Sequence, residues 1–174
     1  MHFVPPSFDP PRTAALGDVN VEVLSPAHAD QDFAAVSASA DSIRHVFGPD
    51  NGWPDSCMTY AENLADLERH AREFDERSAF AYAVLDATGQ KYIGCLYLKP
   101  IKSRTGADRR RERFNAQAFL WMSSLHHEVT EASVRAAASH WFTTIWGLEA
   151  VAWPGRVQSW DEWKGLAEEP PSAA

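Results

Sequence analysis

Two apolar segments separated by a short turn constrain the fold of this chain more than any other feature. The segments "AFAYAVLD" (79–86) and "KYIGCLYL" (91–98) flank "ATGQ", in which Gly89 suits a tight turn. A connection this short predicts an antiparallel hairpin. Because both strands are apolar on both faces, we expect the sheet that contains them to be covered by other elements on each side.

The residues before the hairpin predict a strand and then helices. The segment "VNVEVLS" (19–25) alternates apolar and polar residues, as a half-buried strand does. Ser25 and Asp41 are suited to cap two helices, and Thr59 and Glu62 stand at capping-box spacing at the start of a third. This half of the chain therefore supplies helices that can cover one face of the sheet.

A strand, a helix and a last strand are predicted after the hairpin. The strands are "AQAFLWMS" (116–123) and "LEAVAW" (148–153), and the helix between them begins after Thr130 and ends at Gly147. A crossover of this kind makes its two strands parallel. The predicted fold class is therefore α/β, with a mixed, mostly antiparallel sheet and helices on both faces.

The length of the chain, 174 residues, favours one domain. We expect that domain to span residues 18–164. Residues 1–17 and 165–174 are predicted to be disordered, because both segments contain several prolines and few core-forming residues.

Charge and hydropathy exclude several classes of partner. The net charge of −8 argues against nucleic-acid binding. No run approaches the roughly 20 apolar residues of a membrane-spanning helix, so no membrane association is expected. The first residues contain no apolar signal region, and two cysteines are too few for a disulfide framework. A cytoplasmic location is therefore expected.

One strongly basic segment stands out in this acidic chain. Residues 99–114 contain seven Lys and Arg against two acids. Such a run is most often a solvated loop. The other interpretation is a local attraction for an anionic ligand.

The order of these elements resembles the GNAT fold, the family of Gcn5-related N-acetyltransferases. The resemblance rests on the hairpin, on "AQAFLWMSS", on the helix after Thr130 and on "LEAVAWPGR", and it covers residues 19–156. It implies an acyl-CoA-dependent N-acyltransferase that moves an acetyl group to a small-molecule or peptide amine. Only "VQSWDEWKGLAEEPPSAA" follows this region, so the fold is expected to be short at its C-terminal side, and no catalytic tyrosine is carried over.

The resemblance also implies where acetyl-CoA binds. The strand backbone at Leu120, Trp121, Met122 and Ser123 pairs with the pantetheine arm, and the start of the next helix, at Glu131, Ala132 and Ser133, supplies backbone donors to the pyrophosphate. The family's motif at this place contains glycines, whereas "SSLHHEVTEAS" contains none. The helix N-terminus remains, and it favours an anion without glycines.

His126 and His127 are the predicted catalytic residues, because a histidine near this junction has a pKa suited to a general base. Their alternative interpretation is an exposed loop pair. No spacing of histidines and cysteines predicts a metal site. Tyr97, Trp53 and Trp153 are the predicted substrate-binding residues, since aromatic side chains commonly line small-molecule pockets. Packing in the core is the alternative for these aromatic residues.

Two other functions stay open from the sequence. A protein of this fold that no longer uses acetyl-CoA would serve as a small-molecule binding or interaction module, or would catalyse different chemistry in the same cleft. A cysteine-dependent hydrolase would use Cys95 as its nucleophile. The residues of "SWDEW" (159–163) are expected to pack back on the domain or to contact a second subunit, so a homodimer is a further hypothesis.

Overall fold

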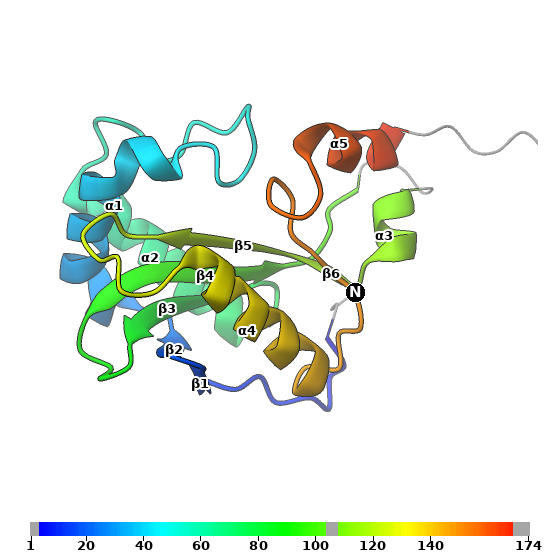
Figure 1. Cartoon of the computed structure of the whole chain (residues 1–174), viewed down its shortest axis with the longest axis horizontal. Coiled ribbons are helices and arrows are strands. Elements are labelled where there is room, and N and C mark those ends of the chain that lie inside the picture. Colours follow the sequence, from blue (N-terminus) through cyan, green and yellow to red (C-terminus); the bar gives the residue numbers. More distant parts are fainter. Residues whose placement is uncertain (1–3, 104–107, 169–174) are drawn as a thin grey trace, which may run out of the picture.

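A six-stranded mixed sheet forms the centre of the protein (Figure 1). The computed structural model describes residues 4–103 and 108–168. The strands follow the order of the chain across the sheet: β1 (Thr13–Leu16), β2 (Val19–Val23), β3 (Phe80–Asp86), β4 (Tyr92–Lys99), β5 (Ala116–Met122) and β6 (Val151–Ala152). Neighbouring strands are antiparallel except β5 and β6, which are parallel. The predicted fold class is confirmed.

Helices cover both faces of this sheet. The helices are α1 (Ala29–Ile43), α2 (Tyr60–Asp75), α3 (Arg109–Arg113), α4 (Glu131–Thr144) and α5 (Trp160–Glu168), with a 3-10 turn, η1 (Pro26–His28), before α1. One face carries α1 and α2, and the opposite face carries α4. The short helices α3 and α5 lie together at the β6 end (Figure 1).

Strand alternation divides the core between these two faces. Tyr97 packs on the side of α1 and α2, in a cluster with Val36 and Leu67. Its neighbour Leu98 packs on the other side, in a cluster with Phe142 of α4. Since successive side chains of a strand point to opposite faces, both sides of the hairpin are buried, as its apolar composition predicted.

Two predicted helix starts are confirmed by their caps. Thr59 Oγ1 accepts a hydrogen bond from the Glu62 backbone N–H at 3.3 Å, and the Glu62 carboxylate accepts from the Thr59 N–H at 2.7 Å. This reciprocal pair is a capping box at the start of α2. Thr130 caps α4 in the same manner by accepting from the Ser133 N–H at 3.2 Å.

The structure differs from the sequence predictions at three places. Residues 13–16 of the segment predicted to be disordered form β1, which pairs with β2. The two helices predicted between residues 25 and 48 are one turn and one helix: Asp41 lies within α1 and does not cap a new helix. The helix α5 includes residues 165–168 of the predicted tail, while 169–174 lie outside the described residues.

The basic segment contains the helix α3, which begins after Asp108. The Asp108 carboxylate accepts from the Arg110 backbone N–H at 3.0 Å, as an N-cap does, and pairs with the Arg110 guanidinium. Residues 104–107 of this segment lie outside the described residues.

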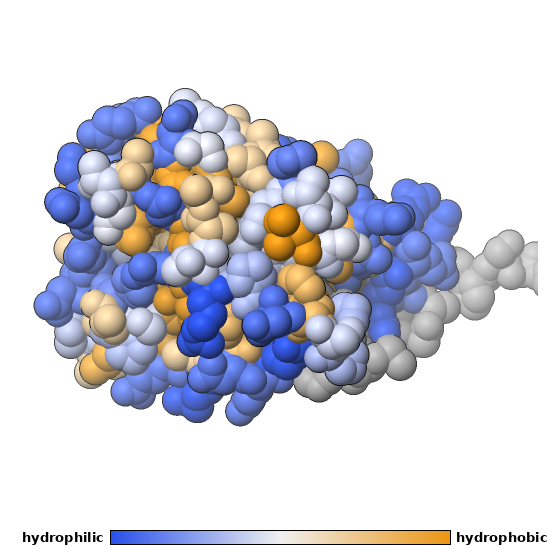
Figure 2. All heavy atoms as spheres, turned by 90° about the horizontal axis from the view of Figure 1, so that it is seen from below, coloured by the Kyte–Doolittle hydropathy of each residue, from blue (hydrophilic) through white to orange (hydrophobic). Residues whose placement is uncertain are grey.

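The surface seen in Figure 2 alternates between hydrophilic and hydrophobic side chains. Hydrophilic residues dominate the outline, and hydrophobic ones show between them nearer the middle of the face. Within residues 4–103 and 108–168, no helix has the length and apolar composition needed to cross a membrane.

Candidate functional site

The parallel strands β5 and β6 pair over a short distance and then separate. Their register contains two residue pairs, Ala116 with Val151 and Gln117 with Ala152. The chain then turns at Pro154 and continues toward α5. Beyond Gln117, the edge of β5 that faces away from β4 has no partner strand in the part of the chain that the structure describes. A free strand edge offers backbone N–H and C=O groups to a ligand.

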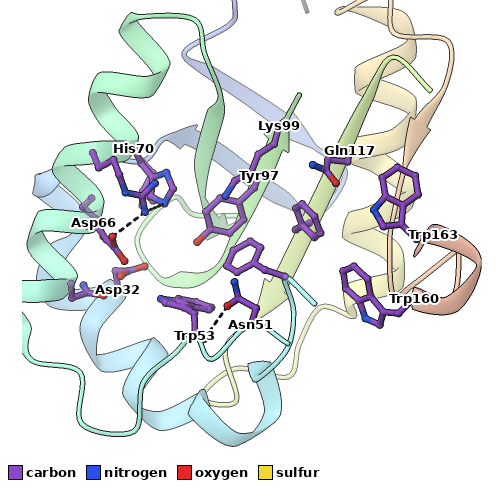
Figure 3. Close-up of a pocket in the computed structure, with 16 residues that line it drawn as sticks. Asp32, Asn51, Trp53, Asp66, His70, Tyr97, Lys99, Gln117, Trp160 and Trp163 are labelled. Atoms are coloured by element: carbon purple, nitrogen blue, oxygen red, sulfur yellow. Dashed lines mark hydrogen bonds and ion pairs between the residues drawn. The ribbon is translucent and has the colours of Figure 1, made fainter. Parts of the chain in front are cut away.

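A cavity of about 380 Å³ lies on the α1/α2 face beside this separation. Gln117 and Phe119 of β5 form part of its wall, and Trp160 and Trp163 of α5 form another part. Figure 3 shows the labelled acids and His70 on the helical side, with Tyr97 between them and the α5 tryptophans. The remaining lining residues are Leu24, Asp32, Phe47, Asn51, Trp53, Asn63, Asp66, Leu67, Arg69, His70, Tyr97 and Lys99. The volume lies in the range of small-molecule sites.

Strand register determines which side chains reach the cavity. Tyr97 stands opposite Phe119, and Lys99 stands opposite Gln117, in the antiparallel pair of β4 and β5. Since alternate residues share a face, all four side chains point to the α1/α2 side. The sheet therefore supplies one wall of the cavity from two adjacent strands.

Aromatic side chains form most of the apolar wall. The ring centroid of Phe47 lies 5.0 Å from that of Tyr97 and 5.3 Å from those of Trp53 and Phe119. Trp160 stacks on Phe119 with an interplanar angle of 14° and a centroid separation of 6.5 Å. Such a wall favours a flat, apolar ligand body.

His70 is the histidine of the cavity, and Glu73 orients it. His70 Nδ1 lies 3.0 Å from Glu73 Oε2, one helical turn away on α2. Burial lowers the pKa of His70 to about 4, with further lowering by the charges of Arg69 and Lys99. The imidazole is therefore neutral near pH 7. In that form Nδ1–H donates to Glu73, and Nε2 keeps a lone pair, which Arg69 Nη2 approaches at 3.4 Å.

Lys99 brings a cation to the aromatic wall. Its Nζ lies 4.7 Å from the centroid of Phe47 and 5.1 Å from that of Tyr97. Both distances are within the range of a cation–π interaction. Burial lowers the pKa of Lys99 below its ordinary value. The surroundings of this ammonium group therefore favour its charged form less than water does.

The two carboxylates of the cavity are already bound within the protein. Asp32 is 3% exposed and accepts a hydrogen bond from the Tyr92 hydroxyl at 2.5 Å. Burial raises the pKa of Asp32. Asp66 accepts from Arg69 Nη2 at 2.9 Å, and the same guanidinium binds Glu73 at 3.2 Å.

The predicted cofactor residues of β5 lie along its free edge and at its end. The side chains of Leu120 and Trp121 are buried on opposite faces, and Trp121 Nε1 donates to the Tyr97 hydroxyl at 3.3 Å. Met122 is partly buried, and the Ser123 N–H bonds the carbonyl of Ile93 at 2.8 Å. Only the backbone of this strand is therefore offered to a ligand at the edge.

The start of α4 has donors but also an acid, Glu131. The N–H groups of Glu131 and Ala132 have no acceptor within the helix, as is general for a first turn. The Ser133 N–H is used by the Thr130 cap. The Glu131 carboxylate accepts from Arg156 Nε at 2.9 Å. Helix α4 thus begins beside an ion pair.

The loop before α4 carries an exposed acid, Glu128. The backbone N–H of Glu128, and to a smaller extent that of His127, lowers the pKa of the Glu128 side chain by hydrogen bonding. An anion bound in this loop would compete with that carboxylate.

Several predicted site residues do not line the cavity. His126 and His127 lie in the loop before α4, where His127 is exposed, and neither lines the cavity. Trp153 is 3% exposed in the core, packs 6.2 Å from Phe142 and does not line the cavity, so its substrate contact stays a prediction that this cavity does not support. Tyr97 and Trp53 do line the cavity.

Cys95 is fully buried and does not line the cavity. Its exposed fraction is 0%, and burial raises the pKa of its thiol. A nucleophilic cysteine requires the thiolate. The hydrolase hypothesis therefore has no support at this residue.

Sequence reasoning did not bring His70, Lys99 and Trp160 together at one cavity. His70 has one visible signal, its position at the edge of the apolar stripe of α2. Lys99 was assigned to the basic segment, and Trp160 to the region after the last strand. No sequence signal places the three side chains around one cavity.

Comparisons with known proteins agree with the fold. No family model matches the sequence, and no curated protein matches it. Among solved structures, a ribosomal-protein-S5-alanine acetyltransferase from Vibrio fischeri aligns with a TM-score of 0.57 and 13% identity, over 92% of this chain and 84% of that one. An acetyltransferase from Salmonella typhimurium that modifies the N-terminal serine of ribosomal protein L7/L12 gives 0.55 and 10%, over 75% and 67%.

A third structure contains ligands. The microcin C7 self-immunity acetyltransferase MccE, in complex with acetyl-CoA and AMP, aligns with a TM-score of 0.56 and 10% identity, over 77% of this chain and 66% of that one. This chain spans about two thirds of the length of the MccE and Salmonella chains. The protein therefore has the fold of the GNAT acetyltransferases. At these identities the likeness shows the fold alone.

Proposed function

We propose that this protein is an acyl-CoA-dependent N-acyltransferase that moves an acetyl group to an amine bound in the cavity. The observation that carries the proposal is the position of the cavity beside the separating strands β5 and β6. A donor at the free edge of β5 and an acceptor in the cavity would meet at the same strand. The GNAT fold of the chain supports this reaction class.

The described residues fit acetyl-CoA at two places. The free edge of β5, at Leu120 to Ser123, would pair with the amide groups of the pantetheine arm. The unused N–H groups of Glu131 and Ala132 at the start of α4 would face the pyrophosphate, since a helix N-terminus attracts anions. Arg156, which already reaches Glu131, would add a positive charge nearby.

His70 is the best-placed proton acceptor for this reaction. Acetyl-CoA would supply a thioester carbonyl to the attacking amine; the C–N bond of the amide would form as the C–S bond breaks, and coenzyme A would leave as its thiolate, which takes up a proton. The amine nitrogen becomes far more acidic as it bonds to that carbonyl, so a weak base suffices to take its proton. His70 is neutral at pH 7 and is held by Glu73, and it lines the cavity. His126 and His127 are less suited, because they lie in the loop that precedes α4.

The acceptor is a small molecule or a peptide amine. The solved structures of the same fold include acetyltransferases for ribosomal proteins, which makes a protein N-terminus one member of this class. A cytoplasmic location and a homodimer stay predictions.

A second candidate function is ligand binding without acetyl transfer. It is favoured by the loop before α4, in which Glu128 places an exposed negative charge close to where an anion would bind. The absence of glycine between Ser123 and Ser133 points the same way, because glycine permits the closest approach of backbone to phosphate. In this case the cavity would still bind its small molecule.

Isothermal titration calorimetry with acetyl-CoA, coenzyme A and acetyl-pantetheine tests the proposal. We expect micromolar binding of acetyl-CoA and weaker binding of acetyl-pantetheine, which lacks the pyrophosphate. Equal affinities would show that β5 binds the arm and that α4 contributes nothing. No binding of acetyl-CoA at millimolar concentration would refute the transferase and favour the second candidate.

A further inference from the structure

Lys99 is the cation of the cavity that lacks an acidic partner. Within residues 4–103 and 108–168, no carboxylate lies within ion-pair distance of its Nζ, which instead lies over the rings of Phe47 and Tyr97. A partly buried ammonium group keeps N–H donors that aromatic faces satisfy only weakly. An anionic ligand group at this place would supply the missing acceptor.

The other charged groups of the cavity are satisfied inside the protein. Arg69 binds both Asp66 and Glu73, and the buried Asp32 is bound by the hydroxyl of Tyr92. The imidazole of His70 is neutral at pH 7. Arg69 is shared by Asp66 and Glu73, so the carboxylates around the cavity are at least as many as its cations, and no ligand charge is needed to neutralise the site. A ligand carboxylate would instead supply an acceptor for the N–H donors of Lys99. One carboxylate is enough for this, and no second free cation is present among the described lining residues to match a dianion.

The side chains next to Lys99 indicate which kind of apolar group the ligand carries beside its anionic group. Phe47 contacts Lys99 and also Trp53 and Phe119, so the ammonium group lies at the border of an aromatic wall. The cavity volume of about 380 Å³ suits a molecule with one aromatic ring and a short chain.

We propose that the acceptor is a small aromatic amino carboxylate, with its carboxylate at Lys99 Nζ and its ring against Phe47, Trp53 and Phe119. This inference rests on the proposed N-acyltransferase function, because it names the substrate class of that site. Lys99 then acts as a specificity residue that selects amines carrying a carboxylate over plain arylalkylamines.

Tryptophan fluorescence provides a test that needs no catalysis, since Trp53, Trp160 and Trp163 line the cavity. The probes are L-phenylalanine, 3-phenylpropanoate, 2-phenylethylamine and phenyl phosphate. We expect the two carboxylates to bind about tenfold more tightly than 2-phenylethylamine, as a charge-assisted hydrogen bond gives. We also expect them to bind more tightly than phenyl phosphate.

Variants assign the preference to Lys99. Lys99→Met keeps the apolar stem, and we expect it to bind the two carboxylates and 2-phenylethylamine with nearly equal affinity. Lys99→Arg keeps the charge, and we expect it to retain most of the wild-type preference for carboxylates. Lys91→Met is the matched control, because Lys91 is exposed in the turn before β4 and does not line the cavity. Circular dichroism establishes that each variant is folded. If Lys99→Met does not fold, the inference is judged by two other results: the order of affinities in the wild type and the carboxylate preference of Lys99→Arg.

Three results would overturn the inference. They are equal or tighter binding of 2-phenylethylamine, tighter binding of phenyl phosphate, and no saturable binding of either carboxylate at millimolar concentration. If Lys99→Met still prefers the carboxylates over 2-phenylethylamine, Lys99 is not the residue that binds the carboxylate. Acetyl-CoA calorimetry separates this test from the proposed function: carboxylate binding without acetyl-CoA binding would leave a binding site and no transferase, and the reverse would leave a transferase for another acceptor.

Discussion

At the scale of single residues, burial determines which charged groups of the cavity can react. His70 is 7% exposed and neutral near pH 7, while Glu73 holds its ring and Arg69 lies beside Nε2. The imidazole is therefore uncharged before the reaction, and it can accept a proton at Nε2 only in place of the contact with Arg69. Lys99 keeps a charge without an acid beside it. The difference between the neutral imidazole of His70 and the ammonium group of Lys99 follows from what packs around each side chain.

The pKa of His70 makes the stability of the protein depend on pH. Its folded-state pKa of about 4 lies below the unfolded value near 6.5, so the unfolded chain binds the proton more readily between these values. The contribution of His70 to stability is complete above pH 6.5 and is lost as the pH falls toward 4. From pH 7 to pH 5 we expect a loss of about 2 kcal/mol in the free energy of unfolding.

Urea unfolding at pH 7 and pH 5 measures this loss in the wild type and in His70→Asn, which cannot titrate. The difference between the two proteins isolates His70 from other groups, such as the buried Asp32. Equal losses in both proteins would contradict the prediction. His127→Asn, in the loop before α4, serves as the control for changing a histidine elsewhere.

At the scale of elements, the sequence predicted the strands and caps that local physics determines. The hairpin, the capping box at Thr59 and the cap at Thr130 are local, and all are present. The split of α1 was wrong because an aspartate is compatible with both a helix cap and a solvent-exposed position inside a helix, and residue type alone does not distinguish the two. Strand β1 was missed because its pairing with β2 outweighs the composition of a proline-rich segment.

The loop before α4 leads to a prediction about cofactor affinity. Glu128→Ala removes an exposed carboxylate, and with it a negative charge, from the loop before the helix N-terminus. We expect acetyl-CoA to bind about fivefold more tightly to this variant, since a helix N-terminus favours an anion more once a nearby negative charge is gone. Calorimetry compares it with Glu68→Ala, which removes an exposed acid from α2.

An unchanged affinity in Glu128→Ala would show that the loop does not meet the pyrophosphate. A similar gain in both variants would show that only net charge matters.

At the scale of the whole molecule, the site depends on contacts that no local pattern contains. His70 comes from α2, Tyr97 from β4, Phe119 from β5 and Trp160 from α5, and the sheet order brings them together. The sequence indicated Tyr97 and Trp53 through their aromatic character. It could not indicate that Trp153 turns into the core against Phe142, because residue type alone does not give the direction of a side chain.

The predicted homodimer depends on which edges of the sheet stay uncovered. Trp163 is 4% exposed and packs near Ile101 and Ala152, so α5 covers part of the β6 end by folding back on the domain. The outer edge of β1 has no partner strand among the described residues and is the remaining edge for a second copy. We expect a dimer in size-exclusion chromatography with light scattering. A monomer at all concentrations would contradict it.

The first residues of the described chain close the α4 face from outside. Val4 is 1% exposed, Phe8 packs 5.1 Å from Trp146, and Arg77 Nη2 donates to the carbonyls of Pro5 and Phe8. During synthesis this segment emerges well before Trp146, because about 140 residues separate them. The segment therefore stays without its native neighbours until almost the whole domain has left the ribosome, and contacts of such long sequence separation slow folding. We infer that this N-terminal segment, with Val4 and Phe8, is among the last parts of the molecule to reach its native contacts.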